Sequence, residues 1–412
     1  MTTAAMQGRM STISEGWARH VGALGVTQII GYGTIYYAFP LLVGPAAQEF
    51  GVSQTYLYAV FSIGLFLGGV VASMAGPWLD RFGAPRVMAT GSACAALLLA
   101  ALGVAPNLFV FSALIILLEA LSFLVLYDAA FAALALGVPI GTRRAITRLT
   151  LIAGFASTLF WPLTGFLTEN LGWRETYLVF AALHLALALP LHLWLIRLTR
   201  PGTAIEGEDL PQAAQPEWPI VKGARVRPAF WLLGISFALT GIVIAALGVH
   251  FVPTLLALGL GTQAYLIGML MGPAQVMIRL IDATLWRNFH PLSVALISGI
   301  AIAGAVAALQ LAGQGLAFAI TFALVFGAGQ GLASIVRGAV PLALFGAPGY
   351  GRRLGHLAAM RNLTMAAAPF AFALSAEALG LRLTLHASLA IALTGFALLF
   401  ALHLLVRRSP NP

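Results

Sequence analysis

Charged residues are scarce in this sequence. Asp, Glu, Lys and Arg together make up 8% of its 412 residues, whereas they make up about 25% of ordinary soluble domains. Hydrophobic residues make up 60%. This balance excludes a soluble globular protein and indicates a chain that crosses a membrane many times.

Cysteine is nearly missing, with Cys94 the single example. The chain therefore cannot form an internal disulfide or a multi-cysteine metal site. It also lacks a Gly-Lys-Ser/Thr phosphate loop, a zinc-protease helix and a nucleophile elbow. We expect no enzyme activity, no cofactor and no metal. A glycine-rich run, Gly327, Gly329 and Gly331, lies inside an apolar segment and is interpreted as close helix packing.

Apolar runs of the length that a bilayer crossing needs, about 20 residues, recur along the whole chain. The sequence predicts an all-α membrane protein with twelve transmembrane helices, at about residues 21–47, 54–75, 87–104, 108–138, 147–168, 174–196, 229–257, 264–286, 292–312, 316–345, 354–379 and 385–406. An even number of crossings returns the chain to the side on which it began.

Positive charge follows the alternation of the predicted loops. Of the 22 Lys and Arg residues, 16 fall in alternate segments, two (Arg174 and Arg382) fall in the other set, and four fall in or beside apolar runs. Because Lys and Arg accumulate in cytoplasmic loops, both termini are predicted to be cytoplasmic. The net charge of +9 thus reflects topology, and no nucleic-acid partner is expected. Since Lys222 is the only lysine, a GC-rich bacterial genome is favoured, and with it a bacterial inner membrane.

One long polar stretch divides the chain, and the two parts resemble each other. We predict an N-terminal six-helix bundle over 1–196, a cytoplasmic linker over 197–228 and a C-terminal six-helix bundle over 229–412. A shift of 209 residues places Asp128 on Arg337, and a shift of 208 places Arg174 on Arg382. Such parallel repeats are typical of transporters that alternate access around a midplane site.

Charge and helix breakers gather between the second and third predicted spans, at residues 76–86 (GPWLDRFGAPR). Proline and glycine there predict a tight turn at the membrane surface. The pattern resembles the signature loop of the major facilitator superfamily, and the matching residues are Gly76, Asp80, Arg81, Gly83 and Arg86. The resemblance implies two pseudo-symmetric six-helix bundles and a gating role for this loop. The alternative is an ordinary basic cytoplasmic loop.

Arg279 is the sharpest candidate for a binding residue. It lies about eight residues, or roughly 12 Å, from the cytoplasmic end of the eighth span, and Gln275 precedes it by one helical turn. A guanidinium fork suits a carboxylate, so these two residues predict a site for an anionic substrate. The alternative is a structural pair between Arg279 and Asp282, three residues later on the same helix.

Asp128 and Arg337 occupy equivalent places in the repeat, near the middle of the fourth and tenth spans, with opposite charges. If both face the central cavity, Arg337 can contact substrate and Asp128 can take up a coupled proton. The alternative is a permanent structural pair. Glu119, nine residues before Asp128, is expected on the opposite face of the fourth span.

The first span carries a stripe of Gln28, Tyr32 and Tyr36 at intervals of four residues, hence on one helix face. This stripe predicts part of a substrate path, with helix packing as the alternative. Arg361, early in the eleventh span, is assigned to an inner gate, with a group lining the cavity as the alternative.

An arginine deep in the eighth span, together with Glu15, Gly16 and Trp17 before the first span, resembles the monocarboxylate-transporter branch and its bacterial relatives. That resemblance implies that Arg279 binds a substrate carboxylate. The expected protein is a monomeric secondary transporter in the bilayer, moving a small organic anion together with protons. The alternative is a proton-coupled exporter of a drug or toxic small molecule, whose fifth-span signature is echoed by Trp161, Pro162 and Gly165.

Overall fold

A computed structural model of the chain describes residues 18–74, 76–137, 142–198, 221–286, 288–346 and 350–407. Within these ranges the chain is helical almost throughout and contains no strand. Twelve helical segments are long and apolar enough to cross a membrane: Ala18–Phe50, Gln54–Val71, Ala84–Gly103, Leu108–Leu134, Arg148–Asn170, Trp173–Leu198, Gly223–Val249, Gln263–Thr284, Pro291–Gln310, Leu316–Phe345, His356–Leu379 and Leu381–Arg407. The predicted fold class and number of spans are confirmed.

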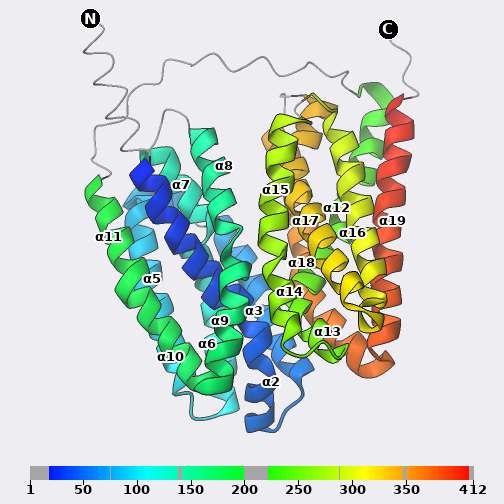
Figure 1. Cartoon of the computed structure of the whole chain (residues 1–412). Coiled ribbons are helices and arrows are strands. Elements are labelled where there is room, and N and C mark those ends of the chain that lie inside the picture. Colours follow the sequence, from blue (N-terminus) through cyan, green and yellow to red (C-terminus); the bar gives the residue numbers. More distant parts are fainter. Residues whose placement is uncertain are drawn as a thin grey trace, which may run out of the picture. The chain divides into compact units, whose positions relative to one another are not determined.

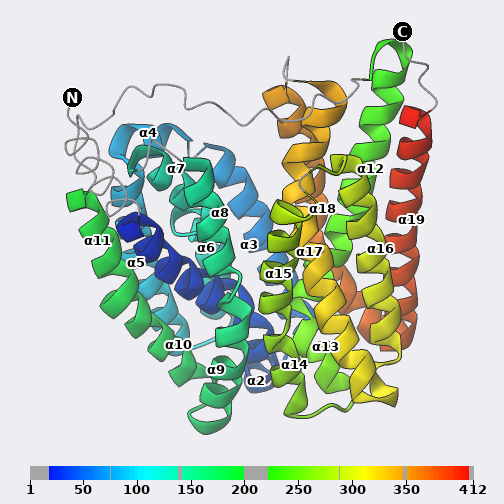
Figure 2. The same ribbon diagram turned by 45° about the horizontal axis from the view of Figure 1, so that its top comes forward.

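The elements of the first half begin with helical residues 18–31. They continue as η1 (Tyr32–Tyr37), α2 (Phe39–Phe50), α3 (Gln54–Met74), α4 (Gly76–Phe82), α5 (Ala84–Gly103), α6 (Leu108–Leu121), η2 (Ser122–Leu124), α7 (Tyr127–Gly137), α8 (Thr142–Ala153), α9 (Ala156–Asn170), α10 (Trp173–Leu183), η3 (His184–Ala188) and α11 (Leu189–Leu198). In both ribbon views α5 lies alongside α10 and α11 (Figures 1 and 2).

The second half has fewer interruptions. Its elements are η4 (Gly223–Arg225), α12 (Val226–Val249), α13 (Phe251–Ala257), α14 (Gln263–Met269), α15 (Met271–Thr284), α16 (Pro291–Gln310), η5 (Ala312–Gln314), α17 (Leu316–Phe345), α18 (Tyr350–Leu379) and α19 (Leu381–Arg407). Here α16 packs between α17 and α19, and α12 packs against α18 and α19.

Contacts divide the chain into two compact units. Unit 1 comprises Met1–Phe50 and Leu67–Ala213, and unit 2 comprises Gly51–Phe66 and Ala214–Pro412. The first part of α3 belongs to unit 2, where Ser62 Oγ accepts a hydrogen bond from the Phe370 backbone N–H at 3.2 Å. The predicted linker over 197–228 lies largely outside the described residues, and the predicted domain boundaries stay a prediction.

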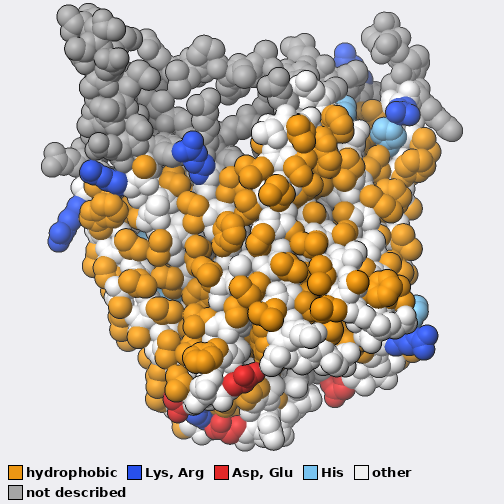
Figure 3. Space-filling model, viewed as in Figure 1, with side chains coloured by type: hydrophobic (Ala, Val, Ile, Leu, Met, Phe, Trp, Pro, Cys, Tyr) orange, Lys and Arg blue, Asp and Glu red, His pale blue; other side chains and the backbone are white. Residues whose placement is uncertain are grey.

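The outward surface of the helices is apolar. Figure 3 shows hydrophobic side chains over most of the viewed helix surfaces, with charged side chains near the helix ends. Large residues such as Phe109 and Leu285 are 82% and 74% exposed. So much exposed apolar surface is unfavourable in water and suits contact with lipid tails, where each helix satisfies its own backbone groups.

Several spans depart from regular α-helix. The first contains the π-helix η1, the sixth contains the π-helix η3, and the fourth is interrupted by the 3-10 turn η2. The predicted span over 229–257 is broken at His250, where α12 ends and α13 begins. Interruptions of this kind are rare and often mark functional positions, because they redirect backbone groups and side chains.

The loop predicted over residues 76–86 is shorter than expected. Residues Gly76–Phe82 form the helix α4, and the chain leaves helical geometry at Gly83, whose φ is +81°. Pro85 lies in the first turn of α5, where its missing N–H costs nothing and its fixed φ suits a helix start. The expectation that Pro77 and Pro85 would hold the whole segment in a turn is therefore wrong.

The glycines of α17 allow close packing against neighbouring helices, as predicted. A Cβ atom added at Gly327 would lie 2.6 Å from the Met271 carbonyl oxygen, and one at Gly331 would lie 2.6 Å from Ile278 Cγ2. Because the contacts advance together along both chains, α15 and α17 run parallel. This packing fixes which residues of α15 lie opposite which residues of α17.

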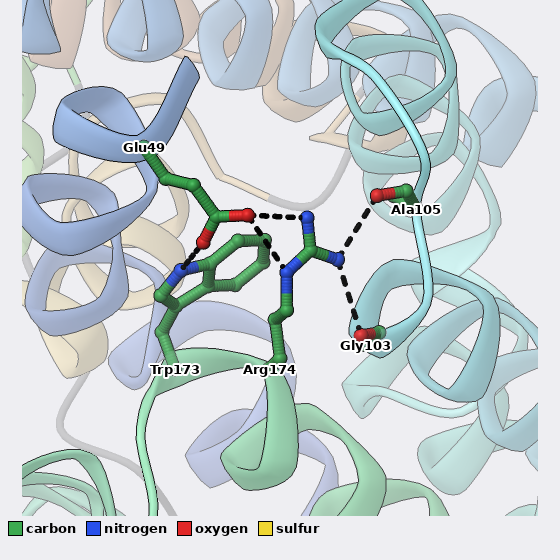
Figure 4. Close-up of polar contacts among 5 residues, drawn as sticks. All are labelled: Glu49, Gly103, Ala105, Trp173 and Arg174. Atoms are coloured by element: carbon green, nitrogen blue, oxygen red, sulfur yellow. Dashed lines mark hydrogen bonds and ion pairs between the residues drawn. The ribbon is translucent and has the colours of Figure 1, made fainter. Parts of the chain in front are cut away.

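A clamp of five residues joins three helix ends in unit 1 (Figure 4). Arg174 donates from Nε and Nη2 to Glu49 Oε1 at 3.0 and 2.7 Å, and from Nη1 to the carbonyl oxygens of Gly103 and Ala105 at 3.2 and 2.9 Å. Trp173 Nε1 donates to Glu49 Oε2 at 2.8 Å. The Glu49–Arg174 clamp therefore ties the end of α2 and the segment after α5 to the start of α10.

We expect Arg174→Ala to lower the free energy of unfolding by about 2 kcal/mol. An exposed ion pair alone contributes about 0–1 kcal/mol, but here two backbone carbonyls also lose a charged donor. Denaturant unfolding of the detergent-solubilised protein measures the difference. Arg382→Ala is the matched control, because Arg382 occupies the equivalent place in the repeat and is exposed; equal losses in the two variants would contradict a stabilising clamp.

Candidate functional site

A chain of polar side chains links α15 to α17 inside unit 2. Gln275 is 6% exposed, and its Nε2 donates to Gln330 Oε1 at 2.8 Å. Its Oε1 in turn accepts a hydrogen bond from Arg279 Nη2 at 3.5 Å. Both ends of the Gln275 amide are thus used, which orients the amide and directs its oxygen toward Arg279. The structure brings Gln275 and Arg279 together, as their spacing predicted.

Gln330 was not among the predicted site residues. It lies between Gly329 and Gly331, and a Cβ added at Gly331 would meet the Gln275 backbone at 3.0–3.2 Å. The absence of a side chain at Gly331 therefore lets the Gln330 amide reach α15. The available signal was an amide side chain within a glycine-rich run of a membrane span, since such a residue needs a hydrogen-bonding partner there.

Two further arginines lie within the spans of unit 2. Arg337, on α17, is within electrostatic reach of Arg361 on α18. Arg361 is partly buried, and its Nη2 donates to Asn362 Oδ1 at 2.8 Å. Its side-chain stem passes α12, where a Cβ added at Gly241 would lie 2.9 Å from Arg361 Cγ. Together with Arg279, Arg337 and Arg361 place partly buried positive charge within the candidate spans of unit 2.

Gln28 has a defined contact in unit 1. The side chain is fully buried, and its Nε2 donates to the Val125 carbonyl oxygen at 2.6 Å. Val125 lies just after η2, where the fourth span is interrupted. Gln28 therefore satisfies a backbone group that the interruption leaves without a helical partner. This is the kind of contact that the helix-packing alternative describes, and a substrate role for Gln28 stays a prediction.

The predicted stripe of Tyr32 and Tyr36 is divided between two aromatic clusters. The Tyr32 ring centroid lies 4.8 Å from that of Tyr127 on α7. Tyr36 packs against Tyr37 at 5.4 Å, and Tyr37 packs against Trp161 on α9, also at 5.4 Å. Because both stripe residues lie within the π-helix η1, whose turns are wider than α-helical turns, an interval of four no longer keeps one face. Tyr37 was missed for this reason, and Tyr127 was missed because its contact with Tyr32 joins two separate helices.

For some of the predicted gating and proton-coupling residues the structure describes the backbone but not the side chain. No side chain is described for Gly76, Asp80 or Asp128, although their backbones lie in α4 and α7. Arg81 is exposed, and its Cζ lies 5.3 Å from the Phe82 ring centroid. Arg86 Nη1 donates to the Phe82 carbonyl oxygen at 3.5 Å, which ties the start of α5 to the end of α4.

Two π-helical segments of unit 1 are joined by a buried hydrogen bond. Thr34, in η1, and His184, at the start of η3, approach at 2.9 Å between Oγ1 and Nε2. Thr34 Oγ1 also donates its single hydrogen to the Ile30 carbonyl oxygen at 2.8 Å. The hydroxyl must then accept from His184, so the imidazole carries its hydrogen on Nε2 and leaves Nδ1 as an acceptor.

Comparison with known proteins agrees with this architecture. The structure resembles that of the human organic anion transporter MFSD10 (TETRAN), with a TM-score of 0.60 at 18% identity, covering 93% of this chain and 99% of that one. It also resembles a bacterial homologue of the human lysosomal transporter Spinster in an inward-facing, unoccupied conformation (TM-score 0.68, 14% identity, 96% and 99% covered). A mutant of the nucleoside transporter NupG gives a TM-score of 0.71 at 13% identity, with 94% and 99% covered.

At these identities the solved structures show a shared fold. No curated protein matches the chain in sequence. The sequence profile of the Major Facilitator Superfamily, in contrast, matches residues 24–336, which is most of the chain. The fold, the twelve spans and this match agree, and the chain belongs to the Major Facilitator Superfamily, a family of multi-pass membrane transporters.

Proposed function

We propose that this protein moves a small organic anion, most simply a monocarboxylate, across the membrane by alternating access and together with protons. The observation that carries the proposal is Arg279, held on α15 by the Gln330–Gln275 amide pair inside a membrane span. An oriented guanidinium presents a planar pair of donors, which matches the two oxygens of a carboxylate.

The charge within the spans of unit 2 supports an anionic substrate. A charged side chain at the centre of a span costs roughly 2.5–3.5 kcal/mol on insertion scales, and Arg279, Arg337 and Arg361 all lie within candidate spans. The acids within the candidate spans of unit 2 are Asp282 and Glu377, the latter two residues before the end of its span. A bound carboxylate would offset part of the surplus positive charge. MFSD10, whose structure is similar, is an organic anion transporter.

The remaining assignments follow from the sequence. The distribution of Lys and Arg supports cytoplasmic termini in a bacterial inner membrane, and the protein is proposed to act as a monomer. The loop with Asp80, Arg81 and Arg86, together with Arg361, is proposed to form gating contacts. Asp128, which occupies the place of Arg337 in the internal repeat, is the carboxyl group proposed for proton coupling.

A second candidate is a proton-coupled exporter of a drug or toxic small molecule. The aromatic clusters around Tyr32 and Tyr37 favour it, since aromatic faces attract organic cations. The repeat and the family suit either direction of transport, so the two candidates differ in substrate charge and in the direction of proton movement.

Purified protein in liposomes that contain a pH-sensitive dye tests both candidates. We expect an inward gradient of lactate, pyruvate or benzoate to acidify the interior faster than in protein-free liposomes. The protein-free control is essential, because neutral carboxylic acids cross bilayers unaided. Carboxylate rates equal to that control would refute the proposal. If tetraphenylphosphonium instead drives protons in the opposite direction to its own movement, the exporter is supported.

A further inference from the structure

Glu119 is a buried acid that the sites described above do not use. It lies on α6, two residues before that helix ends, and its side chain is 2% exposed. Among the described residues it is the only Asp or Glu in the buried class. The 3-10 turn η2 begins three residues later. The carboxyl group thus lies beside the interruption of the fourth span.

The surroundings of Glu119 are compact and contain phenols. Tyr36 in η1 and Tyr177 on α10 lie within electrostatic reach of the carboxyl group. On α3, a Cβ added at Gly68 would lie 2.8 Å from the Glu119 carbonyl oxygen, so that helix contributes close backbone packing. In the part of the chain that the structure describes, no Lys or Arg forms an ion pair with Glu119.

Tyr177 provides a second observation at this place. Its side chain is 2% exposed, and its hydroxyl group has no hydrogen-bond partner among the described residues. A buried hydroxyl left without a partner costs about 1–3 kcal/mol. A group with both donor and acceptor capacity nearby, such as a carboxyl that gains and loses a proton, can serve such a hydroxyl in one state of the transport cycle.

A carboxylate without a cation is costly in this environment, because burying an unpaired charge takes several kcal/mol. The neutral acid avoids that cost. We propose that Glu119 binds and releases a proton during transport. Its carboxylate takes up H⁺ and becomes the neutral acid when the helices enclose the side chain. The proton returns to water when the interrupted segment around η2 opens. The inference rests on the proposed proton coupling and replaces Asp128 with Glu119 as the carrier.

Infrared spectroscopy of the full-length protein in lipid vesicles tests the proton site without any substrate. We expect the carbonyl band of a protonated carboxylic acid in an apolar environment, and we expect Glu119→Gln to remove it. Glu175→Gln is the matched control, since Glu175 on α10 is exposed, and it should leave the band intact. A band that persists in Glu119→Gln would overturn the proposal, and its loss in Asp128→Asn would then assign the proton to Asp128.

A second variant keeps the test valid if Glu119→Gln fails to fold. Tyr177→Phe preserves the ring, and we expect it to shift the pH midpoint of the band, whereas Tyr56→Phe, at a tyrosine that is 44% exposed, should not. An unchanged midpoint in Tyr177→Phe would contradict the assigned environment. In proteoliposomes, Glu119→Gln should retain exchange of labelled lactate but lose accumulation driven by a pH gradient by about tenfold or more. If wild type moves no carboxylate, the substrate proposal fails while the infrared result still decides on Glu119.

Discussion

Arg279→Lys should reduce carboxylate transport by about 10- to 100-fold, equivalent to about 1.4–2.8 kcal/mol, without lowering the amount of protein in the membrane. Lysine keeps the positive charge, so the general attraction for an anion remains. It loses the planar fork, because its three N–H donors share one nitrogen, so it cannot present two parallel N–H groups to both carboxylate oxygens as the guanidinium does. Initial rates of lactate uptake into proteoliposomes over a range of concentrations measure the loss.

Arg382→Lys is the control for the effect of replacing arginine as such. Arg382 is exposed at the start of α19 and belongs to neither the polar chain nor the other span arginines. Its uptake kinetics should match wild type. An Arg279→Lys variant with normal apparent affinity and normal maximal rate would remove Arg279 from the substrate site and return it to a structural role.

Gly327→Leu should cause the largest loss of stability, about 3 kcal/mol or more. Overpacking a dense interior costs about 1–3 kcal/mol when neighbours can shift. At Gly327 the first added carbon would already lie 2.6 Å from the Met271 carbonyl oxygen and 3.2 Å from Met271 Cα. Backbone atoms cannot rotate away, so α15 and α17 must separate. Thermal unfolding of the detergent-solubilised protein, followed by tryptophan fluorescence, measures the change.

Gly304→Leu offers the same substitution without the contact. Gly304 lies on α16, and a Cβ added there meets nothing within 4 Å. Both variants add one leucine to an apolar helix, so differences in hydrophobicity and helix propensity cancel. Gly304→Leu should unfold near the wild-type temperature. Equal destabilisation by both substitutions would show that the α15–α17 contact does not limit stability.

The number of spans could be predicted because lipid leaves few choices. Every backbone polar group in the bilayer interior needs a partner, so long apolar runs must form helices, and their length fixes where they can cross. The proximity of Gln275 and Arg279 was predictable on similar grounds, because residues four apart on an α-helix share a face. Both inferences concern one regular helix at a time.

The parts that the sequence did not predict depend on irregular backbone or on contacts between helices. The stripe of Tyr32 and Tyr36 assumed 3.6 residues per turn, and η1 does not have that geometry. The interruption at residues 122–126 contains neither Pro nor Gly, so no local breaker announced it. Gln330 became a site residue through a partner 55 positions away in the chain, which helical spacing cannot show.

The Glu49–Arg174 clamp also bears on how the two repeats have diverged. Its counterpart in unit 2 would centre on Arg382, whose carbonyl oxygen accepts a hydrogen bond from His386 Nδ1 at 2.6 Å and whose side chain is exposed. Two halves built on one plan thus keep their local stability in different places. On heating, the loop between α18 and α19 should open before the loop between α9 and α10 does, because regions with fewer tethering contacts open first. The loop between α9 and α10 would stay ordered at temperatures at which the loop between α18 and α19 has already lost its structure.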